Sequence, residues 1–303
     1  MKMKTNETMI IKNKNKIKTG VIDVGGGTRG IYAAGVFDYC LDNGIVFDHC
    51  IGISAGSANV VSYMSGQRGR NFQFYNEYAF RKEYMSLHNY LKTRSYIDLD
   101  YIYSTLSDEG GENPFDYDAF MKHPADMEIV ATNALTGKPV YFQKKDIRKN
   151  HYEFLKASSC VPVLNRPYPV RGIPFYDGGI SDPIPLRRAF EAGCDRVVLI
   201  LTRPKQYFRK SRKDRPFAAA LRRHYPQVAH AMARRAAVYN HYLEIALRLE
   251  KKGRVIVIAP DSIGGLKTLT QDHKALEELY EKGYRDAAIL AGKKFFEISQ
   301  ISC

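Results

Sequence analysis

The sequence lacks any long apolar run. Although 45% of its 303 residues are hydrophobic, no segment approaches the roughly 20 consecutive apolar residues that a transmembrane helix needs. The run Met9-Ile10-Ile11 is also too short for the apolar core of a secretory signal peptide. We therefore expect a cytoplasmic protein that does not span a membrane, unless a specialised system exports it.

Cysteine is scarce and shows no ligand spacing. An odd number of cysteines, with no C-x-x-C pair and no Cys/His cluster, argues against a disulfide framework and against a structural zinc site. We expect buried free thiols in a reducing compartment, and we expect neither a metal nor a cofactor. The five cysteines are Cys40, Cys50, Cys160, Cys194 and Cys303.

Acidic residues are few between positions 203 and 254, where 15 Lys and Arg residues stand against Asp214, Glu244 and Glu250. This segment holds most of the formal net charge of +14. So concentrated a basic surface favours an anionic partner, either phospholipid head groups or nucleic-acid phosphates. The alternative is a solvated helix face. Within residues 216–252 the apolar spacing predicts amphipathic helices, a pattern that also suits a membrane interface.

The remaining pattern predicts one domain at residues 17–303, with the basic helical region at about 204–252, and a flexible basic leader at residues 1–16. Apolar strands are expected at residues 18–24, 47–51, 127–132, 139–143, 196–202 and 255–259. The last two are almost wholly apolar, which is typical of strands covered on both faces. Residues 127–143 predict a hairpin at a sheet edge. Further helices are expected at residues 148–158, 182–192 and 270–298.

The first candidate site is a glycine-rich loop between the first strand and a helix predicted over residues 31–41. Its G-x-G-x-x-G spacing is typical of dinucleotide sites, where an acid closes the second strand, but here Asp48 opens that strand and Ser54 ends it. A P-loop would need a following Gly-Lys-Ser/Thr, which is missing. The third interpretation is that loop N–H groups stabilise an oxyanion. The loop residues are Gly25, Gly26, Gly27, Thr28, Arg29 and Gly30.

The second candidate site is the run Gly52-Ile53-Ser54-Ala55-Gly56. In a G-x-S-x-G run, small residues on both sides of the serine allow a sharp strand-to-helix turn that exposes the hydroxyl. A helix is expected over residues 55–64, with its positive end beside Ser54. Gly52 and Gly56 would support this elbow, although glycine and serine also build ordinary turns.

The third candidate site is Asp177, which ends an apolar run and is followed by Gly178 and Gly179. This arrangement can hold a carboxylate at a tight turn, and the alternative is a plain Asx turn. Between the second and third sites, the aromatic-rich residues 71–106 show helical spacing. With the glycine-rich loop at residues 110–114 they predict a mobile lid over an apolar acyl site, and core packing is the alternative.

In this order and spacing, the three motifs resemble those of the patatin-like phospholipase family, and the resemblance covers about residues 18–203. That family carries a D-G-G-G-x-R-G-like loop, a G-x-S-x-G elbow and a later D-G-A or D-G-G. This chain departs from the pattern at Val24, between Asp23 and the glycines, and at Gly179 in place of the commoner alanine. The resemblance implies a three-layer α/β/α fold with a mostly parallel central sheet.

The same resemblance implies hydrolysis of lipid acyl esters by a serine–aspartate dyad. Ser54 is then the nucleophile that forms an acyl-enzyme. Asp177 is the base, and we expect burial to raise the pKa of its carboxyl. The backbone N–H groups of Gly26, Gly27 and Thr28 are expected to stabilise the oxyanion.

The implied substrate is a phospholipid or another acyl lipid, so we expect the basic region to meet an anionic membrane surface and not nucleic acid. Arg29 either steadies the glycine loop or contacts an anionic head group. Two other functions stay open. One is a lipid-binding or regulatory module that keeps the fold without turnover. The other is a Ser-His-Asp esterase, whose histidine would come late in the chain; the candidates are His224, His230, His241 and His273.

Overall fold

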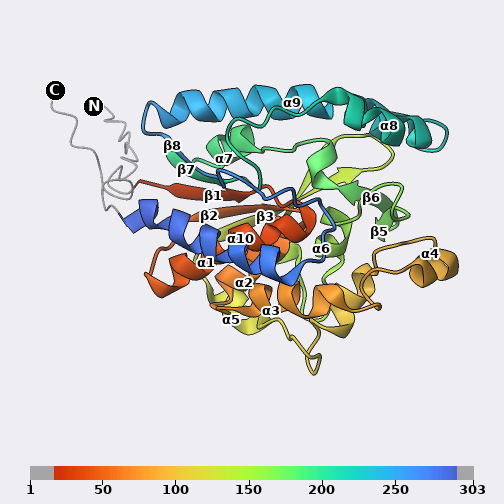
Figure 1. The fold of residues 1–303 in the computed structure, drawn as a ribbon, viewed down its shortest axis with the longest axis horizontal. Helices are drawn as coiled ribbons and strands as arrows, with labels where there is room; N and C mark the ends of the chain where they lie inside the picture. Colours follow the sequence, from red (N-terminus) through yellow and green to blue (C-terminus); the bar gives the residue numbers. More distant parts are fainter. Residues whose placement is uncertain (1–16, 292–303) are drawn as a thin grey trace, which may run out of the picture.

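A computed structural model describes residues 17–291 of the chain, so the leader at residues 1–16 and Cys303 lie outside the described residues. An eight-stranded sheet runs through the middle of the molecule (Figure 1). Its order is β5-β6-β3-β2-β1-β7-β8, and β4 pairs with β3 off this path. The strands are β1 (Thr19–Asp23), β2 (His49–Ile53), β3 (Asp126–Asn133), β4 (Pro139–Gln143), β5 (Tyr168–Val170), β6 (Ile173–Asp177), β7 (Arg196–Ile200) and β8 (Val255–Ile258).

The strands from β3 to β8 across β2, β1 and β7 are parallel to one another, whereas β4, β5 and β6 form the antiparallel side of the sheet. The predicted mostly parallel central sheet is therefore confirmed. The predicted hairpin is confirmed as well, because β3 and β4 pair antiparallel from Glu128 opposite Gln143 to Thr132 opposite Pro139.

Helices cover both faces of the sheet and give the three layers that the resemblance implies (Figure 1). In Figure 1, α7, α8 and α9 lie above the sheet, and α1, α2, α3, α5 and α10 lie below it. The helices are α1 (Ile31–Asp42), α2 (Ala55–Met64), α3 (Arg70–Asn76), α4 (Leu87–Thr93), α5 (Tyr117–Lys122), α6 (Glu153–Ser158), α7 (Leu186–Glu191), α8 (Arg215–Leu221), α9 (Pro226–Glu250) and α10 (His273–Asp286).

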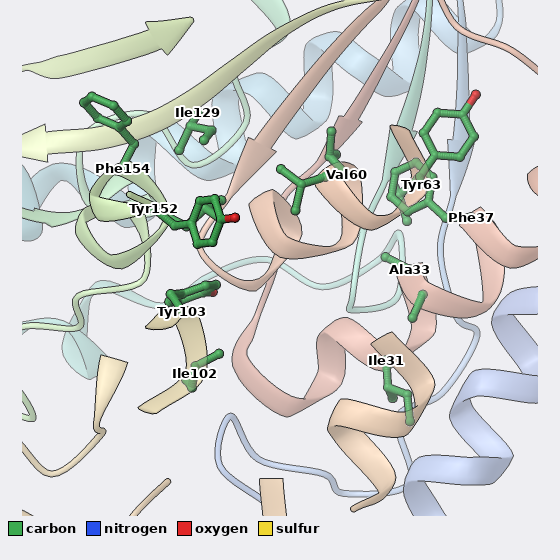
Figure 2. Packing of buried hydrophobic residues seen from close by; sticks show 14 of the residues in the cluster. Ile31, Ala33, Phe37, Val60, Tyr63, Ile102, Tyr103, Ile129, Tyr152 and Phe154 are labelled. Atoms are coloured by element: carbon green, nitrogen blue, oxygen red, sulfur yellow. The ribbon is translucent and has the colours of Figure 1, made fainter. Parts of the chain in front are cut away.

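Two apolar clusters fill the space between the layers. Neighbouring residues of one strand enter different clusters: Val21 of β1 packs with α1 and α2, and Ile22 packs with α7 and α9. This alternation explains why the strands are apolar at nearly every position. Figure 2 shows the first cluster from close by, with Val60 of α2 and Phe37 of α1 among its members.

Two predicted helices are shorter than expected. The helix expected over residues 148–158 is reduced to α6, because Asn150 adopts a left-handed φ of 59° that a helix cannot contain. The helix expected over residues 182–192 is reduced to α7, because Pro183 and Pro185 disfavour helical backbone in the residues before them.

The long helix expected over residues 270–298 begins at the Asp272 N-cap, whose side chain accepts a hydrogen bond from the Ala275 N–H. The α-helix ends at Asp286, and a 3-10 turn follows over Ala287–Ala291. The rest of that predicted helix lies outside the described residues.

The basic region forms α8 and α9, as its spacing predicts. The apolar side of α9 is buried against the sheet through Tyr239, Leu243 and Ala246, so the proposed use of that apolar side at a membrane is wrong: the sheet already occupies it. Within residues 17–291 no helix has both the length and the apolar content to cross a bilayer. The four described cysteines are buried free thiols, as expected.

Candidate active site

Ser54 occupies the turn between β2 and α2, which is the strand–turn–helix setting that the elbow motif predicts. Its backbone has φ 55° and ψ −131°, a strained conformation for a residue with a side chain. The Ser54 N–H donates to Ser158 Oγ at 2.8 Å, and the Ser54 carbonyl accepts the Ser57 N–H at 2.9 Å. The flanking glycines are needed for space, because a Cβ on Gly52 would strike the Ser57 backbone and a Cβ on Gly56 would strike Asp23.

Strand β3 places Asp177 beside Ser54. β2 pairs with β3 as far as Ile53, opposite Val130, and ends there. The part of β3 that pairs with β4 includes residues that also pair with β2 and residues that also pair with β6. β4 therefore occupies one edge of β3, and β2 and β6 lie one after the other along its other edge. On that edge Asp177 pairs with Ala131, the next residue of β3. The antiparallel strand β6 therefore brings Asp177 to the point where β2 gives way to Ser54.

The Asp177 carboxylate is held at a tight turn, where Oδ1 accepts the Gly179 N–H at 2.8 Å. Only 8% of the residue is exposed, and burial raises the pKa of its carboxyl. The Arg235 guanidinium and the Ser54 side chain act in the opposite direction on that pKa. In the described part of the chain, no hydrogen bond of ordinary length and angle joins the Ser54 and Asp177 side chains; such bonds are often loose without substrate. Gly178 packs against the Val130 carbonyl, where a Cβ would not fit.

The glycine loop follows β1 and carries three successive glycines, Gly25, Gly26 and Gly27, all with positive φ. The Gly25 N–H donates to Asp23 Oδ1 at 2.8 Å, and the Thr28 N–H donates to the Thr268 carbonyl at 2.9 Å. Thr28 therefore has no N–H to offer an oxyanion, which corrects that part of the expectation. Within residues 17–291 no loop or turn hydrogen bond uses the N–H groups of Gly26 and Gly27, so these two stay the predicted oxyanion donors.

Asp23 anchors this loop from behind. Its carboxylate accepts the Gly25 N–H and the Asn59 Nδ2–H, each at 2.8 Å, and burial raises its pKa to about 7. Asn59 also donates to the Gly30 carbonyl at 2.9 Å, and a Cβ on Gly30 would strike the Tyr75 hydroxyl. The loop is thus fixed from α2 before any substrate binds.

Arg29 is only 5% exposed and donates from Nη1 to Thr268 Oγ1 at 3.2 Å. Burial and the nearby Arg203 lower the pKa of Arg29 to about 9. Its Nε is buried and has no hydrogen-bond partner among the described residues. The guanidinium thus steadies the loop through Thr268 and also keeps a free donor.

A cavity of about 390 Å³ lies at Ser54 and Asp177, at the carboxyl ends of the parallel strands where open α/β sheets bind ligands. The predicted lid segment lines one part of it. Figure 2 shows Ile102 and Tyr103 of that segment among the buried side chains of the first apolar cluster. The apolar lining includes Phe74, Tyr75, Tyr84, Ile97, Leu99, Ile102, Tyr103, Leu106, Val161, Pro162 and Leu164. Motion of the segment stays a prediction.

The other part of the cavity lining is polar and comes largely from the basic region. Arg203, Arg209, Lys213, Asp214 and Arg235 all belong to it. The sequence pattern placed these residues on a solvated or membrane-facing surface, and the structure places them at the site instead. Counting charged residues along the sequence does not distinguish a buried arginine from an exposed one.

The histidines of the triad alternative do not reach the site. His224, His230, His241 and His273 are exposed, and none of the described residues that line the cavity is a histidine. His273 stacks on the Phe80 ring at 3.6 Å between centroids. Among residues 17–291 no group of three acidic, His or Cys side chains could hold a metal ion.

The dinucleotide alternative is not supported either. Asp48 lies just before the amino end of β2, where Oδ2 accepts the Thr19 N–H and hydroxyl, and it is a whole strand length from the glycine loop. A ribose acid would have to lie at the carboxyl end of that strand.

Residues 24–190 match the family Patatin-like phospholipase, and residues 225–289 match a second family, DUF6363, which is described as a domain of unknown function. The first match covers more than half of the chain. The protein therefore belongs to the patatin-like phospholipase family, which confirms the resemblance found in its motifs. The family supports a lipid acyl hydrolase activity in general terms.

Two further comparisons give individual proteins. The uncharacterized protein YjjU of Escherichia coli (strain K12) is 28% identical over 197 residues, which are 61% of this chain and 52% of that protein. The chain thus matches about half the length of this curated relative. The crystal structure of VipD from Legionella pneumophila shares 14% sequence identity at a TM-score of 0.46, over 91% of this chain and 66% of that chain.

Proposed function

We propose that the protein is a serine lipid acyl hydrolase of the phospholipase A or lysophospholipase type, which cleaves fatty-acyl esters with Ser54 and Asp177. One observation carries this proposal: a serine on a strained turn and a buried carboxylate from a different strand meet at an apolar cavity. The cavity lining suits an acyl chain, and the polar end suits a head group.

In the proposed reaction Ser54 Oγ attacks the ester carbonyl carbon while Asp177 accepts the hydroxyl proton. The N–H groups of Gly26 and Gly27 stabilise the oxyanion that forms on the carbonyl oxygen. When the intermediate collapses, the bond to the alcohol breaks and the alcohol leaves with the proton from Asp177. Water then attacks the carbonyl carbon of the acyl-enzyme while Asp177 accepts one of its protons. When this second intermediate collapses, the bond between the acyl carbon and Ser54 Oγ breaks, Asp177 returns the proton to that oxygen, and the fatty acid is released.

The choice of Asp177 as the base follows from its surroundings. An exposed carboxylate is a weak base near neutral pH, but burial raises the pKa of Asp177 and makes its anion a better proton acceptor. Arg235 acts in the opposite direction on that pKa, because its positive charge favours the ionised carboxylate. The proposed reaction therefore needs no histidine between the serine and the aspartate.

A fluorophosphonate probe tests the nucleophile. The wild type should be labelled and the Ser54→Ala variant should not, because the probe forms a covalent bond with an activated serine. If the wild type stays unlabelled, or Ser54→Ala is labelled to the same extent, the protein is not a serine hydrolase acting through this residue, and the lipid-binding module becomes the better description.

Hydrolysis of a panel of acyl lipids tests the base. Asp177→Asn should lower kcat by about 100-fold or more, since it removes a general base but keeps the Gly179 hydrogen bond. Replacing His224, His230, His241 or His273 should leave kcat near the wild-type value. A comparable loss in one of these four histidine variants would reveal a triad and overturn the dyad.

A further inference from the structure

The polar end of the cavity holds four arginines, which we name the arginine cluster: Arg29, Arg203, Arg209 and Arg235. They come from separate parts of the chain, since Arg29 belongs to the glycine loop, Arg203 and Arg209 follow β7, and Arg235 lies on α9. Three of the four lie outside residues 24–190, the range that matches the family.

The arginine cluster carries more positive charge than its neighbours balance. Arg209 forms a two-point ion pair with Asp214, with contacts of 2.9 Å and 2.6 Å. Arg203 lies over the Tyr207 ring at 4.4 Å from its centroid. In the described part of the chain, Arg29 and Arg235 make no ion pair. Burial lowers the pKa of Arg235 to about 10; the nearby Arg209 acts in the same direction, and Asp177 and Asp214 act against it.

Two members of the arginine cluster also have unused donors. Nε of Arg29 and Nε of Arg235 are buried, and neither finds a hydrogen-bond partner within residues 17–291. Arg70, another arginine of the cavity wall, differs because it donates to Ser62, Ser107 and Asn113. An unpaired donor on a buried cation is unfavourable, so the free donors of Arg29 and Arg235 suit acceptor oxygens that come from a ligand.

Arg235 lies beside the turn that holds Asp177. A Cβ on Gly179 would lie 3.5 Å from Arg235 Nη2 and 3.1 Å from Asp177 Oδ1. The Asp177 carboxylate and the Arg235 guanidinium therefore lie on either side of the same glycine. The head group of a lipid could therefore bind Arg235 while an ester of the same lipid lies at Ser54.

We propose that the arginine cluster binds the phosphate of an acyl lipid whose head group is net negative, with Arg235 as a specificity-determining residue. Arginine suits this role because its donors match phosphate oxygens in pairs. A zwitterionic head group is disfavoured, because its ammonium would enter a site with unbalanced positive charge. The proposal rests on the proposed function, since it names the substrate class of that same site.

The test compares dihexanoyl phosphatidic acid with dihexanoyl phosphatidylcholine, both below their critical micelle concentrations. Monomeric lipids remove any contribution from binding to a charged interface. For the wild type, kcat/KM should favour the phosphatidic acid by about 10-fold to 100-fold, the range that a charged hydrogen bond supplies. Arg235→Met should remove most of that preference, and Arg235→Lys should keep part of it.

Arg234→Met is the matched control, because Arg234 is the neighbouring arginine of α9 and is exposed to solvent. It loses the same charge and should keep the wild-type preference. The comparison uses the ratio of the two substrates, since the effect of Arg235 on Asp177 acts on both equally. Isothermal titration of Ser54→Ala with each lipid gives the same preference as a binding constant and does not depend on how Arg235→Met folds.

Fluorophosphonate labelling separates the two ways of failing. If the wild type is labelled but hydrolyses both lipids equally well, the hydrolase stands and the anionic subsite is wrong. If the wild type is not labelled, the proposed function itself is wrong, and the proposal of an anionic subsite is then wrong as well. Equal loss of preference in Arg235→Met and Arg234→Met would also overturn the role of Arg235.

A second surface carries an independent inference. Helix α4 buries none of its residues, and Leu87, Tyr90 and Leu91 are 67%, 38% and 73% exposed. Beside it Val163 is 47% exposed. We name these four residues the α4 face. Leu87, Tyr90 and Leu91 lie on a helix that projects from one end of the molecule, and Val163 lies in the loop between α6 and β5 (Figure 1).

The α4 face is continuous with the cavity. The chain on the two sides of α4 pairs at Met85 and Ile97, and Ile97 lines the cavity. Val163 lies between two more cavity residues, and the Tyr96 N–H donates to the Leu164 carbonyl at 2.7 Å. Residues 84–97 include Lys92 and Arg94 but no acid. We propose that the α4 face enters an anionic lipid surface and places the cavity over its acyl chains.

The chain contains no tryptophan, so a single Trp substitution reports on one position. Leu91→Trp should show a blue-shifted emission with vesicles of equal phosphatidylcholine and phosphatidylglycerol, because the indole leaves water. Val46→Trp is the control, since Val46 is exposed just before the amino end of β2, away from the cavity. Unchanged Leu91→Trp emission on vesicles that sediment the protein, or no sedimentation at all, would overturn the α4 face as a lipid contact.

Discussion

Asp177 is subject to two opposing influences, and their balance sets the pH range of the proposed reaction. Burial raises the pKa of its carboxyl, and the positive charge of Arg235 lowers it. The base acts only when it is ionised, so kcat/KM falls as the pH drops through this pKa. Removal of the Arg235 charge should therefore move the acid limb of the pH profile to higher pH.

We expect this shift in Arg235→Met, measured as kcat/KM against pH on one neutral acyl ester. Arg234→Met, which removes an exposed charge from the same helix, should show a smaller shift or none, because solvent screens it. An acid limb that stays in place in Arg235→Met would show that Arg235 does not act on Asp177.

Ser158 supports the backbone of Ser54, the proposed nucleophile, and is not among the residues that line the cavity. Its hydroxyl accepts the Ser54 N–H at 2.8 Å and donates to the Val130 carbonyl at 2.6 Å. Ser158→Ala would leave both buried groups without a partner, so the free energy of unfolding should fall by about 1–3 kcal/mol. Urea denaturation measures this change, and Ser211→Ala at an exposed serine is the control. Equal stability of Ser158→Ala and wild type would contradict the assigned role.

The residues of the motifs could be predicted from the sequence, whereas the residues that position them could not. Ser54 and Asp177 stand in short patterns whose local geometry is encoded within a few residues. Ser158 and Arg235 carry no pattern of their own, because each gains its role from a strand or helix far away in the chain. Thr28 shows the same limit, since its N–H is occupied by Thr268, 240 residues later.

At the level of elements, α9 is the part of the basic region that reaches both the cavity and the sheet. Its helical spacing could be predicted, but the surface against which it packs could not, since a sheet and a membrane select the same apolar stripe. The early part of α9 brings Met232 and Arg235 to the cavity, and the later part buries Leu243 on the sheet. One helix therefore contributes both to the wall of the cavity and to the core.

Leu243→Ala tests this coupling. Leu243 is fully buried, so its truncation should lower the free energy of unfolding by about 2–5 kcal/mol. We predict that residues 17–291 unfold as one unit, so fluorophosphonate labelling of Ser54 should be lost in the same urea transition. Glu244→Ala, at the exposed neighbouring position, should change stability by no more than about 0.5 kcal/mol. Two separate transitions would show that α9 belongs to an independent domain.

Element boundaries were harder to predict than element types. All-apolar strands such as β7 and β8 were clear because both faces of the sheet are covered. The shortened helices were missed where a single residue decides the backbone, as Asn150 does with its left-handed φ. Asparagine tolerates that conformation at modest cost, so its identity alone did not reveal the break.

At the scale of the whole molecule, the basic residues behind the net charge of +14 are divided between the cavity and the exposed surface. Part of it is directed inward, in the arginine cluster. The remainder is exposed, and Arg222 and Arg223 at the junction of α8 and α9 are examples. Figure 1 places α8 and α4 at the same end of the molecule. That end presents basic side chains and the apolar α4 face together, which is the combination that holds a protein at an anionic bilayer.

Binding to vesicles should therefore depend on both charge and salt. We predict that the protein sediments with phosphatidylglycerol vesicles, less with phosphatidylcholine vesicles, and that raising the salt from 0.15 M to 1 M, where the Debye length falls from about 8 Å to about 3 Å, weakens the first interaction. Replacing both Arg222 and Arg223 by Ala should weaken it by about 2 kcal/mol, at about 1 kcal/mol for each charge. Lys122→Ala, on α5 in the opposite layer, should have a smaller effect than either arginine. Equal binding to neutral and anionic vesicles would show that the basic surface does not recruit the protein to membranes.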